Sequence, residues 1–338
     1  MSTTTSSSTL VEPGSVGELI ELSRQHPMHW LVPGIVLEDG VHILHGPEES
    51  FKTMLTLQLH EALTVGGQFL MRSSVGGLRT GVAELEMKNR LFAHRLANFF
   101  KQDPPDIRVL PDTLRQTVLS GRTPKHRIET IVNWSESEGL DLVSIDSAVK
   151  LFPPGCDLSR ADLASEVFSQ LQRLPTVWII AHDRKPLSGM TATGGNAEIV
   201  GSGRFAQDPD VIHEMARQDR RAPVAEFSWG KMREGEKSDS IPLYFDRVDY
   251  RLYPLHPYLH LLVQRPMLEG ELIAEAERRY GWKERRAREY LTSLRQLVDV
   301  SGNPCVRESM RGHNKVLEIS GTTVALERPE ELLQGCNN

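Results

Sequence analysis

The stretch that decides the fold is "HILHGPEESFKTML", residues 42–55. An apolar run ends at Gly46, and Lys52 and Thr53 open a segment with helical periodicity. This is the outline of a phosphate-binding loop. In such a loop, backbone N–H groups converge on phosphates at a helix N-terminus, a lysine reaches the terminal phosphates and a hydroxyl binds Mg²⁺. The alternative is an ordinary strand-to-helix turn with a chance lysine.

The loop departs from the usual pattern at several positions. Phe51 precedes the lysine where glycine is usual, Pro47 offers no N–H, and Glu48 and Glu49 place negative charge beside an anion site. Phe51 is acceptable if its φ is one that a non-glycine residue adopts. We predict that the loop still binds nucleotide, through Gly46, Pro47, Glu48, Glu49, Ser50, Phe51, Lys52, Thr53 and Met54.

Bulk properties limit the class of protein. A chain of 338 residues has room for a main domain and a smaller one. The formal net charge of -6 argues against a surface that is basic throughout, so any nucleic-acid site is expected to be local. Three widely spaced cysteines exclude a disulfide scaffold, and no apolar run is long enough for a membrane span. We therefore expect a cytoplasmic protein without a membrane partner.

Short apolar runs alternate with amphipathic stretches along the middle of the chain. The runs are "VHILHG", "GVAELEM", "DLVSID" and "TVWIIAH", and the helical stretches cover residues 52–65, 88–100 and 160–172. Because parallel strands need crossover connections, this alternation predicts an α/β core with a mostly parallel sheet. The stretches "VAEFSWGKMREGEKSDSIPLYFD" and "YRLYPL" predict antiparallel strands at the sheet edge, and the core is expected to end near Pro254.

The pattern changes after "HPY" to three helices and a hairpin. Residues 258–265, 269–280 and 282–296 have helical periodicity, and "LVDVSGNPCVRESMRGHNKVLEIS" alternates around turn residues. This order predicts a winged helix whose third helix keeps an apolar stripe and presents basic residues elsewhere. The basic residues of that helix and of the wing are Lys283, Arg285, Arg286, Arg288, Arg295, Arg307, Arg311, His313 and Lys315.

Two carboxylates end predicted strands. Asp146 closes "LDLVSID", and Glu86 stands near the end of "GVAELEM". Ligands gather at the carboxyl edge of a parallel sheet, so Asp146 can hold Mg²⁺ together with Thr53, although an aspartate there also serves as a helix N-cap. Glu86 beside the terminal phosphate could orient or deprotonate the attacking water.

The ordered motifs of residues 29–250 resemble a known family. "GIVLEDGVHILHGPEESFKTMLTLQLHEALTVGGQFL", "LEMKNRLFAHRL", "LVSIDSAVKLF", "VWIIAHDRK" and "GGNAEIVGSGRFAQDPDVI" are similar to the RecA-like ATPases of the plasmid replicative helicase RepA group, relatives of DnaB and RecA. The resemblance implies a RecA-like P-loop fold, ATP and Mg²⁺ as cofactors, and Glu86 as catalytic base. Arg95 corresponds to a further arginine of the nucleotide site.

The resemblance also implies residues that respond to nucleotide or reach a neighbour. His182, followed by Lys185, corresponds to a histidine that senses the terminal phosphate, although a lone strand-end histidine is more often a satisfied polar group. Arg204, Lys231 and Arg233 correspond to basic residues that enter the site of the adjacent subunit; ordinary surface charge is the alternative. The implied assembly is a ring or filament of identical chains, with a hexamer expected.

We therefore predict a flexible segment over residues 1–28, a RecA-like ATPase domain over 29–255, a winged helix over 256–325 and a flexible tail over 326–338. The expected function is an ATP-hydrolysing motor, a helicase or remodelling enzyme acting on DNA as an oligomer. Two alternatives remain open. One is a nucleotide-gated DNA-binding regulator with little turnover, and the other is a structural adaptor with an empty loop.

Overall fold

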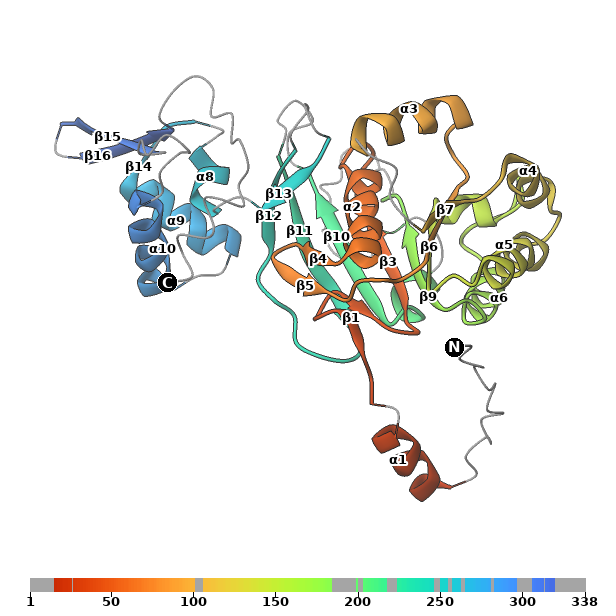
Figure 1. Cartoon of the computed structure of the whole chain (residues 1–338). Coiled ribbons are helices and arrows are strands. Elements are labelled where there is room, and N and C mark those ends of the chain that lie inside the picture. The colour runs from red at the N-terminus through yellow and green to blue at the C-terminus, as the bar shows by residue number, and fades with distance from the viewer. Residues whose placement is uncertain are drawn as a thin grey trace.

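A nine-stranded sheet forms the centre of the molecule (Figure 1). The computed structural model describes residues 15–25, 27–100, 106–183, 199, 203–217, 224–245, 250–254, 257–262, 265–280, 283–296, 306–312 and 314–319. The strand order is β13-β12-β11-β10-β3-β9-β8-β6-β7. The strands are β3 (Val41–His45), β6 (Thr80–Glu84), β7 (Ile107–Val109), β8 (Leu142–Asp146), β9 (Thr176–Ile180), β10 (Val211–Ala216), β11 (Val224–Met232), β12 (Ile241–Phe245) and β13 (Leu252–Pro254).

The sheet is parallel from β10 to β7 and antiparallel from β10 to β13. Every residue of β3, β6, β8 and β9 is buried, as expected for parallel strands covered on both faces. The predicted α/β fold with antiparallel edge strands is confirmed. Two short ribbons, β1 (Trp30–Val32) with β2 (Val36–Leu37) and β4 (Gly67–Phe69) with β5 (Arg72–Ser74), lie outside it.

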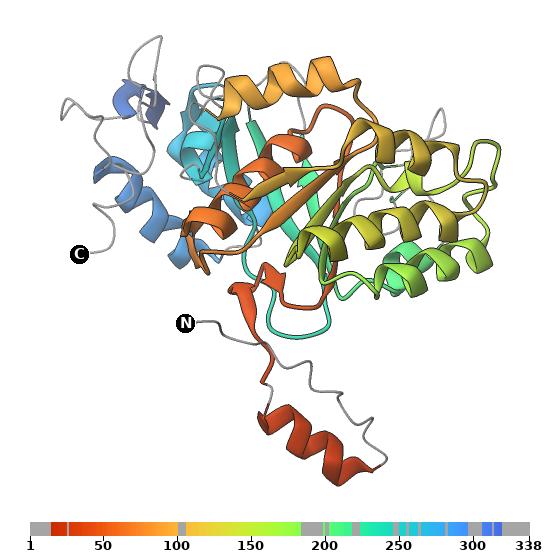
Figure 2. The same ribbon diagram turned by 45° about the vertical axis from the view of Figure 1, so that its right-hand side comes forward.

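Helices cover the two faces of this sheet and define two apolar clusters (Figure 2). One cluster packs α2 (Lys52–Val65) and α3 (Asn89–Phe99) against one face. The other packs α4 (Asp112–Ser120), α5 (Pro124–Glu138), α6 (Ala161–Leu171) and α7 (Arg204–Gln207) against the opposite face. Helices α4 and α5 were not singled out by the alternating pattern. A 3₁₀ turn, η1 (Ala148–Leu151), follows β8.

A polar stripe on α2 contacts three successive strands. Thr56, His60 and Thr64 follow an i, i+4, i+8 spacing, which places them on one helix face. Thr56 Oγ1 accepts a hydrogen bond from Trp178 Nε1 on β9 at 3.0 Å, and His60 Nε2 lies 2.7 Å from Ser144 Oγ on β8. Thr64 Oγ1 lies 3.3 Å from Thr80 Oγ1 on β6. These buried contacts register α2 on the sheet.

The C-terminal part contains α8 (Pro257–Leu262), β14 (Met267–Leu268), α9 (Glu269–Tyr280), α10 (Glu284–Gln296), β15 (Val306–Arg311) and β16 (Asn314–Ile319). The three strands form an antiparallel sheet in the order β14-β16-β15, and the helices enclose a separate apolar cluster. At the other end, α1 (Val16–Gln25) has no buried residue and stands away from the sheet in Figure 1. In the described part of the chain, no helix has the length and apolar character needed to cross a bilayer.

Candidate active site

The loop between β3 and α2 passes very close to β10. A Cβ atom built on Gly46 would lie 2.2 Å from the carbonyl oxygen of Met215, so only glycine fits there. The Gly46 carbonyl accepts a hydrogen bond from the N–H of Asp183 at 3.2 Å, and His45 Nδ1 lies 2.7 Å from Asp183 Oδ1. The start of the loop is therefore held by strand ends on both sides of β3.

Phe51 occupies a backbone conformation that favours glycine. Its φ is 67° and its ψ is 14°, which is the left-handed region. From the sequence, Phe51 is acceptable on the condition that its φ is one that non-glycine residues readily adopt. The observed φ does not meet that condition. The ring stacks on Phe245 at a centroid distance of 4.4 Å, and the Arg217 guanidinium lies 4.3 Å from the ring centroid. Arg217 also donates a hydrogen bond to the Glu49 carbonyl. These contacts offset a strain of about 1–2 kcal/mol.

This conformation predicts an unusual order of stability at position 51. Phe51→Ala keeps the left-handed strain and loses the ring contacts, whereas Phe51→Gly loses the contacts but relieves the strain. We expect the alanine variant to be less stable than the glycine variant by about 1 kcal/mol in urea unfolding, although alanine is normally the more stabilising residue. An alanine variant more stable than the glycine variant would contradict the assigned backbone.

Lys52 lies inside the curve of the loop. Its ammonium donates to the carbonyls of Gly46 at 2.8 Å and Pro47 at 2.6 Å, and to Ser50 Oγ at 3.2 Å. Burial lowers the pKa of Lys52 to about 8, while the nearby carboxylates, Asp183 foremost, oppose that shift. The first intrahelical bond of α2 runs from the Leu55 N–H to the Phe51 carbonyl. The N–H groups of the first turn, at Lys52, Thr53 and Met54, thus precede the helical hydrogen bonds and suit an anion.

Thr53 and Asp146 meet beside this lysine. Thr53 Oγ1 donates a hydrogen bond of 2.7 Å to Asp146 Oδ2 at the carboxyl end of β8. Burial raises the pKa of Asp146, and the Thr53 hydrogen bond opposes this effect. Over the residues that the structure describes, no group of three or more His, Cys, Asp or Glu side chains could hold a metal by itself. One hydroxyl and one carboxylate fit Mg²⁺, which binds through few protein oxygens plus water and phosphate.

Glu86 faces the same edge of the sheet, just after β6. Ser147 Oγ donates a hydrogen bond to Glu86 Oε1, and His182 Nε2 lies 3.4 Å from Glu86 Oε2. The His182 contact, followed by the one with Ser147, lowers the pKa of Glu86 to about 2. The Glu86 side chain is 35% exposed, so a water molecule can reach it. The structure thus brings the predicted Lys52, Thr53, Asp146, Glu86 and His182 to one edge.

The sequence profile of a family described as AAA domain matches residues 9–187, which is more than half of the chain. The chain belongs to this AAA domain family. The structure of the ATPase domain of G40P is similar to the chain at 14% identity and a TM-score of 0.51, covering 72% of this chain and all of that domain. This likeness confirms a RecA-like P-loop fold.

A KaiC-like protein, PH0186 from the archaeon Pyrococcus horikoshii OT3, also matches. Its identity is 14% and its TM-score 0.46, and the match covers 66% of this chain and 94% of that protein. No curated protein sequence matches the chain.

Three predicted basic residues gather away from the phosphate loop. Arg204 lies 3.4 Å from Asp208, and Lys231 Nζ donates to the Pro209 carbonyl at 2.7 Å. Arg233 donates to the Asp208 carbonyl at 2.9 Å. The contacted residues, 207–209, come just before β10, and the first residue of β10, Val211, pairs with His42 near the start of β3. The phosphate loop follows the other end of β3. The two places are about 10 Å apart along the strand.

The structure does not bring every other predicted residue to the phosphate loop. Arg95 lies on α3, and among the described residues no hydrogen bond or ion pair joins it to the loop. Lys185 and His313 lie outside the described residues.

Sequence reasoning missed Glu84, the last residue of β6. Its side chain is almost fully buried, and burial, reinforced by the neighbouring Asp146, raises its pKa to about 7. By pKa alone Glu84 would make the better general base, but a base must first reach the water. Glu84 is only 3% exposed and is therefore closed off from water. The Glu86 side chain is 35% exposed, so Glu86 is the carboxylate that water can reach. A charged residue two positions before Glu86 in an otherwise apolar strand was the available signal.

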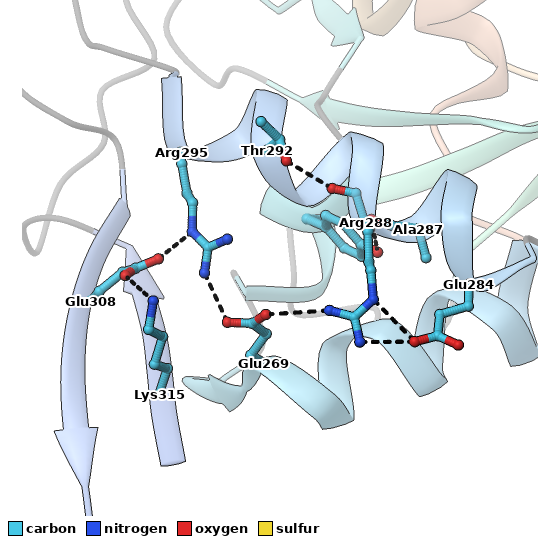
Figure 3. Close-up of polar contacts among 9 residues, drawn as sticks. Glu269, Glu284, Ala287, Arg288, Thr292, Arg295, Glu308 and Lys315 are labelled. Atoms are coloured by element: carbon cyan, nitrogen blue, oxygen red, sulfur yellow. Dashed lines mark hydrogen bonds and ion pairs between the residues drawn. The ribbon is translucent and has the colours of Figure 1, made fainter. Parts of the chain in front are cut away.

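Two arginines of α10, Arg288 and Arg295, form ion pairs within the C-terminal part (Figure 3). Arg288 lies 2.8 Å from Glu284, and Arg295 lies 2.8 Å from Glu269. Arg295 also contacts Glu308, which lies 3.6 Å from Lys315. The helix therefore presents less unpaired positive charge than its sequence suggests. Arg307 and Arg311 on β15 are exposed.

Proposed function

We propose that the chain binds MgATP at the β3–α2 loop and hydrolyses it. Lys52 and the first-turn N–H groups of α2 hold the phosphates, and Thr53 with Asp146 would hold Mg²⁺, which would neutralise phosphate charge. Glu86 accepts a proton from the attacking water, and His182 orients Glu86. The observation that carries the proposal is the Thr53–Asp146 hydrogen bond of 2.7 Å beside the buried ammonium of Lys52.

The proposal includes a site shared between copies of the chain. Lys231, Arg233 and Arg204 cluster at the edge where β3 begins, at the opposite end of that strand from the phosphate loop of their own chain. This position supports a role for their positive charge in the phosphate site of a neighbouring copy. A homo-oligomeric ring or filament, expected to be a hexamer, satisfies this geometry.

We further propose that turnover drives movement or remodelling of nucleic acid, with DNA as the expected partner. The helix and strand order of the C-terminal part, with β14 pairing β16 and β16 pairing β15, supports a winged helix. Since Arg288 and Arg295 of α10 are ion-paired, the exposed Arg307 and Arg311 on the wing are better placed than these two to meet a phosphate backbone.

A regulator with little turnover is the second candidate. The contacts of Glu86 with His182 and Ser147 stabilise its carboxylate and lower its pKa to about 2, which makes it a weaker base and favours slow hydrolysis. Steady-state ATPase rates with and without single-stranded DNA separate the two candidates. A motor requires turnover that DNA stimulates, whereas nucleotide-dependent DNA binding with negligible hydrolysis under both conditions supports the regulator.

A further inference from the structure

The turn that presents Glu86 is held from inside by Glu84. Glu84 Oε1 accepts hydrogen bonds from the N–H groups of Glu86 at 2.8 Å and Met87 at 2.7 Å. One carboxylate oxygen therefore satisfies two consecutive backbone donors that follow the end of β6. Hydrogen bonds in the protein interior are stronger than in water, and burial shields these two from competing water.

The same turn is held from outside by Arg115 of α4. Arg115 Nε donates to the Glu84 carbonyl at 3.0 Å, and Arg115 Nη2 donates to the Met87 carbonyl at 2.9 Å. The Arg115 side chain is only 11% exposed, and it lies 3.6 Å from Asp112 one turn earlier on its helix. The guanidinium thus spans the turn and fixes the carbonyls at its two ends.

Together the two side chains make four hydrogen bonds to the backbone of residues 84–87, all between 2.7 and 3.0 Å. The helix that follows, α3, has no side-chain cap at its N-terminus. The turn therefore depends on Glu84 and Arg115 for its shape, and Glu86 lies inside it.

We propose that Glu84 and Arg115 are positioning residues that hold the Glu86 carboxylate where it meets the attacking water. This inference rests on the proposed role of Glu86. Neither side chain touches the reacting atoms, and both act through the backbone of the turn. Since a displacement of about 1 Å of a catalytic group can cost 10²-fold in rate, loosening the turn should reduce the rate of hydrolysis and leave nucleotide binding to the loop unchanged.

The decisive comparison is Glu84→Leu with Glu84→Gln. Glutamine has the same shape and keeps an oxygen acceptor for both N–H groups, whereas leucine has none. We expect Glu84→Leu to lower kcat by about 10- to 100-fold with the Kd of a fluorescent ATP analogue within about twofold of wild type, and Glu84→Gln to retain most of kcat. Arg115→Met should lower kcat in the same way, and it provides the test from the other side if Glu84→Leu does not fold.

A double variant separates positioning from general damage. In a Glu86→Gln background, Glu84→Leu should cause no further loss, because there is no base left to position. A wild-type kcat for Glu84→Leu or Arg115→Met, an equal loss in Glu84→Gln, or an equal further loss in the double variant would overturn the proposal. Wild-type turnover by Glu86→Gln alone would instead refute the proposed function of Glu86.

Discussion

Replacing Arg233 with alanine is expected to reduce ATP hydrolysis by about 10³- to 10⁵-fold while leaving nucleotide affinity nearly intact, and Arg204→Ala should act in the same direction. An arginine supplied by a neighbour stabilises charge that develops only in the transition state, so its loss affects the rate and not binding. Both side chains lie near the start of β3, away from the loop of their own chain. Hydrolysis rates and the Kd of an ATP analogue measure the two effects.

Mixing two inactive variants tests the shared site. Arg204→Ala protein keeps an intact phosphate loop, and Lys52→Ala protein keeps intact arginines. A mixed assembly therefore contains interfaces with one complete site, and activity should partly return on mixing. Specific activity should also rise with protein concentration. If the rate per chain is flat down to dilutions at which the protein is monomeric, the site is not shared.

Acidification is expected to destabilise the fold through three buried histidines. Burial lowers the pKa of His42 to about 4 and those of His60 and His213 to about 3, against about 6.5 in the unfolded chain. Below pH 6.5 the unfolded chain therefore binds protons that the folded chain does not, so stability falls as pH decreases towards 4. At pH 5 each buried histidine lowers the free energy of unfolding by about 2 kcal/mol, and the three together lower it by about 6 kcal/mol.

Glu84 acts in the opposite direction. Its pKa is raised to about 7 in the fold, so the folded chain takes up this proton more readily than the unfolded chain between pH 7 and 4.5. This uptake raises the free energy of unfolding by about 2 kcal/mol. Urea unfolding at pH 8, 7, 6 and 5 should show the net loss, and His60→Gln should flatten the slope by about one proton. The matched control is His126→Gln, which makes the same change at a histidine whose side chain is exposed in the fold. Equal stability at pH 8 and pH 5 would contradict the account.

The sequence predicted the parts of the fold that depend on local periodicity. Buried strands such as β3 and β8 appear as continuous apolar runs, and the residues that follow them meet at one edge because the strands are parallel. This rule located Lys52, Asp146 and Glu86 together without any structural information.

Contacts between distant segments could not be predicted in this way. Phe51 can adopt a left-handed backbone conformation because Phe245 and Arg217, which are far away in the sequence, pack against its ring. The sequence suggested that Arg295 on α10 could contact DNA. In the structure Arg295 forms ion pairs with Glu269 and Glu308, which belong to other elements of the C-terminal part. The role of Glu84 depends on hydrogen bonds to a turn whose shape no residue pattern reveals.

Titration of the wild type, Lys52→Ala and Glu86→Gln with a fluorescent ATP analogue in the presence of Mg²⁺ tests the central claim most directly. The account predicts saturable binding by the wild type and by Glu86→Gln, because Glu86 acts on water and not on phosphate. It predicts no measurable binding by Lys52→Ala, whose loop lacks the buried ammonium that contacts Gly46, Pro47 and Ser50. Equal affinity of the wild type and Lys52→Ala would contradict the assignment of this loop as the phosphate site.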